Sequence, residues 1–205
     1  MKSYRSASDL KTEIGRLLAE AKPRIGKASP LERVVETLYE GRHYFWIGIY
    51  LVVGEQVVRQ AFRGPVPPCH AFAFGKGNVG TTGQKGITKV IPDVASDPTY
   101  SMCFIETKSE IVVPIRIAGR TLGVIDVESD KPNAFGSQER ILLEQVARDL
   151  ARFFTSKGRY LVIRARRRQQ LTAPPAGVER GRQPASDRTA VETSTRRAAA
   201  GEKSR

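Results

Sequence analysis

Residues 45–62 read FWIGIYLVVGEQVVRQAF and contain the clearest strand signals in the chain. This stretch contains two segments rich in β-branched and aromatic residues, 45–53 and 56–62, which are separated only by Gly54 and Glu55. Two such segments joined by two residues, one of them glycine, are typical of a β-hairpin with a tight turn. The stretch therefore predicts two adjacent antiparallel strands.

A second hairpin is predicted further along the chain. Residues 110–118 and 121–128 are again β-rich and flank a Gly-Arg turn. Shorter β-rich segments at 70–74 and 87–91 supply further strands. Because hairpins join antiparallel strands, these segments predict an antiparallel sheet rather than an all-parallel one.

Helical periodicity occurs before and after the strand segments. Residues 8–22 form an amphipathic pattern that Ser8 can cap, and Ser29 with Glu32 fits a capping box at the start of a second helix. Residues 137–157 form a long amphipathic helix that ends at a glycine. Together with the hairpins, these helices predict an α+β fold in which the helices pack on one face of the sheet.

The positive charge is unevenly distributed along the chain. The net charge is +13, and residues 159–205 hold 12 of the 34 Lys and Arg residues but only 4 Asp and Glu residues. Apolar periodicity is lost there, and after a basic run of sequence RARRRQQ the composition is typical of disorder. We therefore divide the chain into an N-terminal helix and linker (1–27), an α+β domain (28–158) and a basic disordered tail (159–205).

The sequence disfavours several classes of protein. The N-terminus has no apolar core of a signal peptide, and the longest apolar run, 45–53, is too short to span a membrane. We therefore expect a cytoplasmic protein without membrane contact. Two cysteines and two histidines that lack zinc-ligand spacing predict no metal site. The glycine-rich run GKGNVG lacks the ending of a phosphate-binding loop, which argues against a nucleotide site.

One long irregular segment is the first candidate for a functional site. Residues 92–109 are polar, contain Cys103 and show no regular periodicity. A loop of this length inside a compact domain is usually functional. A lone cysteine is more often an inert buried residue than a nucleophile, so both interpretations of Cys103 stay open at this point.

Short motifs spread over residues 30–155 carry a family resemblance. They are WIGIYLV, GPVPPC, FGKGNVGTT, VIPDV, SEIVVPI, LGVIDVESD and AFGSQE. In these motifs the chain resembles GAF domains and, more narrowly, the free methionine-(R)-sulfoxide reductases. The resemblance implies a GAF-like antiparallel sheet flanked by helices. It also implies an enzyme without a bound cofactor that reduces free methionine-(R)-sulfoxide and is recycled by thioredoxin.

The resemblance assigns a role to both cysteines. Cys103 matches the catalytic cysteine of the family, and Cys69 in GPVPPC matches the resolving cysteine. Their separation of 34 residues agrees with that of the family, whereas a third family cysteine is replaced here by Val79. The implied cycle passes through a sulfenic acid on Cys103 and a Cys69–Cys103 disulfide.

The resemblance also assigns five substrate-binding residues, which are Trp46, Tyr50, Glu110, Asp126 and Glu128. Glu128 stands where the family more often has aspartate. Residues an even number apart on a strand point to the same face of the sheet. Asp126 and Glu128 are two residues apart and Trp46 and Tyr50 are four apart, so the members of each pair share a face, which supports a common site. Clustered carboxyl groups raise one another's pKa, so we expect at least one to stay protonated and to donate to the sulfoxide oxygen.

Two other functions are carried as alternatives. The first is a GAF sensor that holds a small ligand without turnover, which would suit the presence of Val79 and Glu128. The second is weak contact between the basic tail and nucleic acid, although the tail has no stacking aromatic residue beyond Tyr160. A homodimer is carried as a further possible partner.

Overall fold

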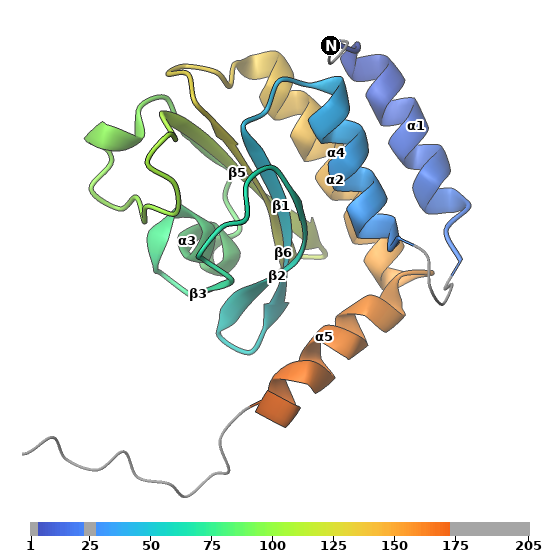
Figure 1. The fold of residues 1–205 in the computed structure, drawn as a ribbon. Helices are drawn as coiled ribbons and strands as arrows, with labels where there is room; N and C mark the ends of the chain where they lie inside the picture. Colours follow the sequence, from blue (N-terminus) through green and yellow to red (C-terminus); the bar gives the residue numbers. More distant parts are fainter. Residues whose placement is uncertain (1–3, 23–27, 173–205) are drawn as a thin grey trace, which may run out of the picture. The chain divides into compact units, whose positions relative to one another are not determined.

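The computed structural model describes residues 4–22 and 28–172 of the chain. Six strands form one antiparallel sheet in the order β3-β2-β1-β6-β5-β4 (Figure 1). The strands are β1 Trp46–Val53, β2 Gln56–Arg63, β3 Ala71–Ala73, β4 Lys89–Ile91, β5 Ser109–Ile117 and β6 Arg120–Ser129. The β1–β2 and β5–β6 pairs confirm both predicted hairpins and the antiparallel sheet.

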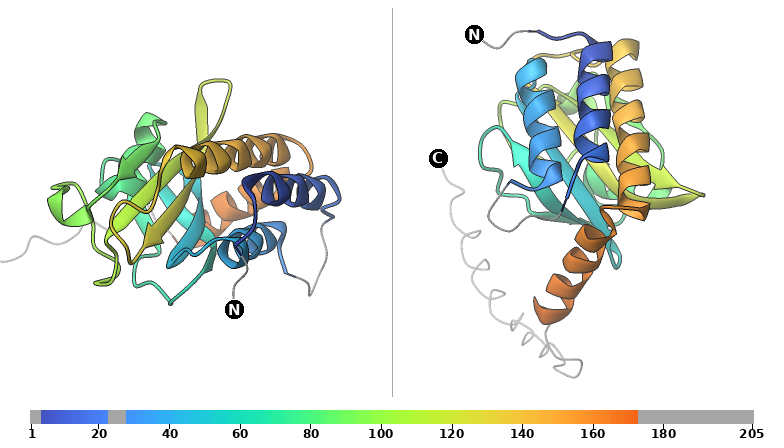
Figure 2. Two further views of the ribbon diagram at one scale, coloured as in Figure 1. Left: turned by 90° about the horizontal axis from the view of Figure 1, so that it is seen from above. Right: turned by 90° about the vertical axis from the view of Figure 1, so that its right-hand side faces the viewer.

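Helices cover both faces of this sheet. They are α1 Ala7–Ala19, α2 Pro30–Gly41, α3 Gly77–Lys85, α4 Ser137–Thr155 and α5 Arg159–Thr172, with a short 3-10 helix at Val94–Ser96. Figure 2 shows α1 lying between α2 and α4 on one side, and α3 lies on the opposite side of the sheet. The expectation that all helices pack on one face is therefore wrong for α3, whose buried residues Asn78, Val79 and Thr82 face the other side. None of the helices in the described ranges is long and apolar enough to cross a membrane.

Two hydrophobic clusters lie on opposite faces of the sheet. The larger cluster joins the sheet to α1, α2, α4 and α5. The smaller cluster lies beneath α3 and consists of Trp46, Tyr50, Val57, Phe72, Val79, Phe104, Val112 and Val124. The larger cluster provides most of the apolar burial that stabilises the fold. The smaller cluster carries most of the aromatic residues that the sequence singled out.

The helix starts follow the capping signals in part. Ser29 Oγ accepts from the Glu32 backbone N–H at 3.2 Å, and Glu32 Oε2 accepts from the Ser29 N–H at 2.6 Å, which confirms the capping box. In α1 the cap is Ser6, whose Oγ accepts from the Asp9 N–H at 3.1 Å. The prediction of Ser8 as the cap is wrong, because the cap lies two residues earlier, at Ser6, and Ser8 is already within the helix.

A helix replaces the first part of the predicted tail. We predicted disorder from residue 159, and this is wrong for Arg159–Thr172, which forms α5. Leu161 and Ala165 lie one helical turn apart and are buried in the larger cluster, so tertiary packing stabilises a segment whose basic composition suggested disorder. The rest of the predicted tail, 173–205, lies outside the described residues. Because α1 also packs on this cluster, the compact unit extends beyond 28–158 at both ends.

A buried ion pair joins the end of α2 to the start of α4. Arg42 Nε donates to Glu139 Oε1 at 3.1 Å, and Arg42 Nη2 and the Tyr44 hydroxyl also donate to the Glu139 carboxylate. Arg42 and Glu139 are both buried. Removing one partner of such a pair by substitution leaves an uncompensated buried charge, which is strongly destabilising.

Candidate active site

Three neighbouring strands place the candidate residues in rows on the side of the sheet opposite α2. Glu128 in β6 lies between Trp46 in β1 and Glu110 in β5. In the next row, Asp126 of β6 is the partner of Gly48 in β1. Residues two apart on a strand share a face, so the three carboxyl groups face the same side. The structure thus brings Glu110 of β5 together with Asp126 and Glu128 of β6.

All three carboxyl groups are buried. The exposed fractions are 3% for Glu110, 2% for Asp126 and 4% for Glu128. Asn78 of α3 donates from Nδ2 to Glu110 Oε2 at 2.6 Å. Thr107, at the end of the long loop, donates from Oγ1 to Glu128 Oε2. Two of the three acids are therefore held by side chains from outside the sheet.

Burial changes the protonation of this cluster. Burial raises the pKa of Glu110 to about 7, against the opposing hydrogen bond from Asn78. Burial also raises the pKa of Glu128 to about 8, against the hydrogen bond from Thr107. The pKa of Asp126 is raised well above its usual range by burial, and next by the charges of Glu110 and Glu128. The cluster therefore retains protons at neutral pH and can donate a hydrogen bond to a ligand oxygen.

An aromatic wall lies beside the acids. The Trp46 ring centroid is 6.4 Å from Tyr50, 6.2 Å from Phe62 and 6.0 Å from Phe104. Gly48 makes this arrangement feasible, because a Cβ atom at that position would lie 2.2 Å from the Trp46 ring. The indole therefore lies along β1 over the glycine. This explains physically why the motif reads Trp-x-Gly-x-Tyr.

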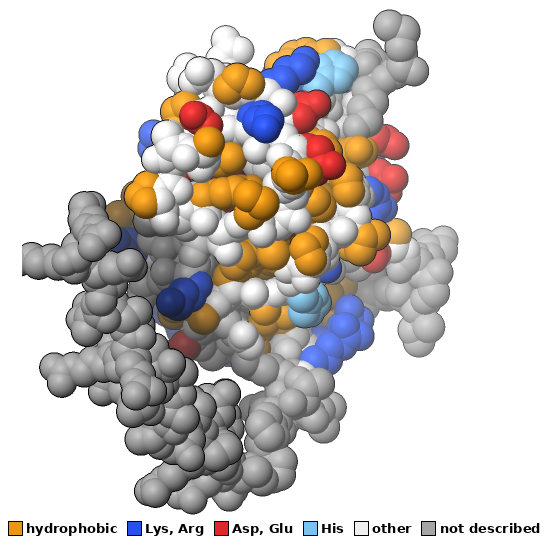
Figure 3. All heavy atoms as spheres, turned by 60° about the vertical axis from the view of Figure 1, so that its left-hand side comes forward, with side chains coloured by type: hydrophobic (Ala, Val, Ile, Leu, Met, Phe, Trp, Pro, Cys, Tyr) orange, Lys and Arg blue, Asp and Glu red, His pale blue; other side chains and the backbone are white. Residues whose placement is uncertain are grey.

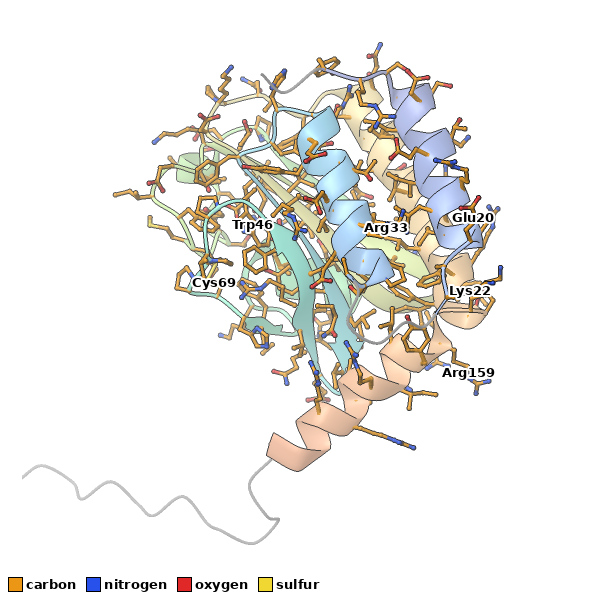
Figure 4. The ribbon with its side chains drawn as sticks, turned by 45° about the vertical axis from the view of Figure 1, so that its right-hand side comes forward. Glu20, Lys22, Arg33, Trp46, Cys69 and Arg159 are labelled. Carbon is orange, nitrogen blue, oxygen red and sulfur yellow. A yellow bond between two sulfur atoms is a disulfide. The ribbon has the colours of Figure 1, made fainter. Side chains whose placement is uncertain are left out.

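A disulfide closes the site on the loop side. Cys69 and Cys103 are bonded, with Cα atoms 5.9 Å apart and a sequence separation of 34 residues. Both cysteines are partly buried and pack against the smaller hydrophobic cluster. Figure 4 shows Cys69 and Trp46 on the same side of the β1–β2 pair, away from α2. The bond ties the turn before β3 to the long loop, so the predicted pair does come within disulfide reach.

The surface around this disulfide is partly apolar. Figure 3 shows the face of the molecule on the side of α3, where hydrophobic side chains reach the surface between charged ones. Val66, Met102 and Ile105 are exposed large hydrophobic residues. Each lies within three residues of Cys69 or Cys103 along the chain.

Some buried polar atoms of the site have no partner within the described residues. They include Trp46 Nε1, the Tyr100 hydroxyl and Asp126 Oδ1. An unpaired buried polar group costs free energy unless something satisfies it. Two of these atoms belong to residues predicted to bind substrate, and a polar ligand with donor and acceptor groups fits them.

The profile of the GAF domain family matches residues 29–153, which make up more than half of the chain. The chain belongs to the GAF domain family. Its six-stranded sheet with helices on both faces is the GAF fold, as a solved structure of the GAF domain with TM-score 0.64 and 26% identity confirms. The alignment covers 72% of this chain and 88% of the chain in that structure.

This GAF domain has relatives with and without a named activity. It is 38% identical over 117 residues to GAF domain-containing protein A of Dictyostelium discoideum, covering 57% of this chain and 73% of that protein. It is 37% identical over 107 residues to the free methionine-R-sulfoxide reductase of Saccharomyces cerevisiae, covering 50% of this chain and 59% of that enzyme. The structure of free methionine-R-sulfoxide reductase from Neisseria meningitidis with its substrate has a TM-score of 0.69 and 28% identity, covering 78% and 99% of the two chains.

Sequence reasoning missed four residues of this site. Asn78 and Thr107 hold two of the acids by hydrogen bonds. Tyr100 lies near the acids, since its pKa is raised by burial and next by the charge of Glu128. Phe104 packs in the smaller hydrophobic cluster. Three of the four lie in the long loop that was predicted to be functional because of its length. Asn78 lies in the glycine-rich run, which was considered as a phosphate loop and as a family motif, with no role given to the asparagine. The loop length was therefore a usable signal, although it did not identify the residues.

The remaining sequence expectations concern substitutions and metals. Val79, at the position of a third family cysteine, is buried in α3 and packs in the smaller cluster. Glu128 extends to Thr107, so its longer side chain has a hydrogen-bond partner. In the part of the chain that the structure describes, no three His, Cys, Asp or Glu side chains are grouped to hold a metal ion. The absence of a metal cofactor stays a prediction.

Proposed function

We propose that this GAF domain reduces free methionine-(R)-sulfoxide, with Cys103 as the nucleophile and Cys69 as the resolving cysteine. One observation carries the proposal, namely a disulfide that packs on the same cluster as a tryptophan lying beside three buried, protonatable acids. The relatives in yeast and Neisseria meningitidis that bear this activity in their names support the choice of substrate.

The first chemical step is the transfer of oxygen to Cys103. Its thiolate attacks the sulfoxide sulfur, the S–O bond to the substrate breaks, and methionine leaves. The oxygen passes to the cysteine sulfur, where a new S–O bond forms, and one proton completes the sulfenic acid. The sulfoxide is thereby reduced by two electrons and the cysteine sulfur is oxidised by two.

The acid cluster supplies the proton in this proposal. Asp126 is the best candidate donor, because its carboxyl is fully buried and its Oδ1 has no partner within the described residues. Glu110 and Glu128, with pKa values raised to about 7 and about 8, bind the other polar groups of the substrate. Trp46 and Tyr50 provide the apolar wall for the methyl-sulfur end of the ligand.

The second step closes the disulfide, and the third reopens it. The Cys69 thiol attacks the sulfenic sulfur, the S–S bond forms, and the oxygen leaves as water. An external dithiol then reduces the Cys69–Cys103 bond by thiol–disulfide exchange. We propose thioredoxin as this reductant.

The alternative is a sensor that binds the same ligand without turnover. Val79 in place of a third cysteine and Glu128 in place of aspartate are the features that favour it. A sensor and an enzyme differ in what happens to the ligand. The sensor returns methionine sulfoxide unchanged, whereas the enzyme converts it to methionine.

The test is a comparison of the wild type with Cys103→Ser and Cys69→Ser. With thioredoxin, its reductase and NADPH, we expect the wild type to release methionine from the R epimer through many turnovers. Cys103→Ser is expected to release none. Cys69→Ser is expected to release about one methionine per chain and then to stop at the sulfenic acid, because the resolving thiol is missing.

The matched control is the S epimer of the sulfoxide under the same conditions. We expect no turnover with it. Failure of the wild type to release methionine, with ligand affinity equal in the wild type and Cys103→Ser, would establish the sensor instead.

A second proposal concerns the basic helix α5. Arg164, Arg166 and Arg167 are exposed on it, and arginine contacts to phosphates give salt-sensitive binding. We propose that these arginines contact nucleic acid weakly. Changing all three to glutamine should abolish retardation of a duplex DNA at low salt, and unchanged retardation would refute this contact.

A further inference from the structure

Arg59 lies beside the proposed active site, and the proposed function gives it no role. It is the β2 partner of Tyr50 in β1. The register of the β1–β2 pair shifts between Ile49 and Tyr50, which makes Gln60 an additional residue on β2. A bulge of this kind changes which side chains face inward. Arg59 and Phe62 therefore face the same side although they are three residues apart.

Arg59 holds the segment that carries the resolving cysteine by two hydrogen bonds. Its Nη1 donates to the carbonyl oxygen of Cys69 at 2.6 Å. Its backbone N–H donates to the carbonyl oxygen of His70 at 3.0 Å. The turn just before, residues 64–68, contains three prolines, which have no N–H to donate. Arg59 is thus the main polar anchor of this segment on β2.

The guanidinium of Arg59 is itself fixed from its other side. Its Cζ lies 4.7 Å from the centroid of the Phe62 ring. Phe62 in turn stacks on Trp46, with centroids 6.2 Å apart and ring planes at 19°. No ion pair involves Arg59 within residues 4–22 and 28–172. The orientation of the guanidinium therefore depends on Phe62 and on the Cys69 carbonyl.

We infer that Arg59 is a positioning residue that holds Cys69 within reach of Cys103 for the closure of the disulfide. The inference rests on the proposed function, since it concerns the second step of that cycle. In this step the Cys69 thiol attacks the Cys103 sulfenic acid, giving the disulfide and one water. An anchored thiol attacks faster than one on a loose turn, because less freedom is lost on reaching the transition state.

The inference predicts which step a substitution slows. Arg59→Met keeps a long apolar stem for packing on Phe62 but removes the donor to Cys69. Losing a charge-assisted hydrogen bond of this kind corresponds to a rate change of about tenfold or more. We expect disulfide closure to slow by about that factor and methionine release in the first turnover to change by less than about twofold.

The experiment uses hydrogen peroxide as well as the sulfoxide. Peroxide converts the Cys103 thiol to the sulfenic acid and yields water, so closure is observed whether or not the protein is a reductase. Reduced full-length protein is mixed with one equivalent of peroxide, and the sulfenic acid is trapped with dimedone at successive times and quantified by mass spectrometry. Arg59→Lys, which keeps one charged donor, should close at an intermediate rate.

The matched control is Arg63→Met. Arg63 lies on the same strand but donates to Phe62 O and to Glu36 Oε2, away from the cysteines. We expect it to close within about twofold of the wild type. Closure at the wild-type rate in Arg59→Met, or equal slowing in Arg63→Met, would overturn the inference. A wild type that closes with peroxide but releases no methionine from the sulfoxide would refute the proposed function alone.

Discussion

Replacing Glu128 by glutamine is expected to make the stability of the reduced protein less dependent on pH. Burial raises the pKa of Glu128 from 4.5 to about 8 in the folded state. In the unfolded chain the same group has its ordinary pKa of 4.5. The folded protein thus retains a proton that the unfolded chain releases. The stability contributed by this group is therefore fully present below about pH 4.5. It decreases progressively as the pH rises towards about 8, because the unfolded chain then loses its proton first.

The size of this effect follows from the shift in pKa. One pKa unit corresponds to about 1.36 kcal/mol. For a pKa near 4.5 in the unfolded chain and about 8 in the folded state, the loss of stability between pH 5 and pH 7 is on the order of 2–3 kcal/mol. Glutamine carries no titrating proton, and its amide oxygen can still accept from Thr107. The variant should therefore lose this part of the pH dependence and keep the hydrogen bond.

The assay is urea unfolding followed by tryptophan fluorescence. Trp46 is the single tryptophan of the chain and is 1% exposed, so its emission reports on the integrity of this site. The free energy of unfolding is measured at pH 5, 6 and 7 with a phosphine reductant that keeps the cysteines open. Glu106→Gln is the control, because Glu106 is an exposed glutamate in the adjacent loop. If the free energy of unfolding changed equally between pH 5 and pH 7 in the wild type and in Glu128→Gln, the raised pKa of Glu128 would be refuted.

Three further predictions concern stability. The oxidised protein should be more stable than the reduced protein by about 4 kcal/mol, since the Cys69–Cys103 bond closes a loop with a separation of 34 residues; equal urea midpoints with and without reductant would contradict this. Arg42→Met leaves the buried carboxylate of Glu139 without its guanidinium and should cost about 3–5 kcal/mol, an effect that Glu139→Gln in the same chain should partly relieve. Truncation after Gly158 removes α5, including the buried side chains of Leu161 and Ala165, and should cost about 3 kcal/mol by urea unfolding, whereas an unchanged midpoint would show that α5 does not stabilise the domain.

Local patterns in the sequence predicted the elements that depend on local physics. The Gly54-Glu55 turn predicted the first hairpin, because a two-residue connection is only compatible with adjacent antiparallel strands. The Ser29 and Glu32 pair predicted the start of α2, because both hydrogen bonds form within one turn. Strand alternation likewise predicted that Asp126 and Glu128 face the same side.

Prediction was wrong where packing overrides local composition. The segment that forms α5 is rich in arginine and lacks a strong apolar stripe, so its sequence resembles a disordered tail. It is helical because Leu161 and Ala165 are buried against elements distant in the chain. The start of α1 was misplaced for a different reason, because Ser6 and Ser8 are both suitable cap residues and the local sequence does not distinguish them.

Sequence patterns alone were enough to predict the two hairpins, the pairs of residues that share a face, and the family whose motifs include the two cysteines and the acids. The position of Glu110 opposite Glu128 required the folded structure, because register between strands depends on the packing of the whole sheet. The folded structure alone brought Asn78, Thr107 and Arg59 to the acids and to the resolving cysteine, since helix α3, the long loop and the bulge in β2 are placed by contacts between distant segments. The difference is physical, because alternation and capping are set by neighbouring residues, whereas burial and pKa are set by everything that surrounds a group.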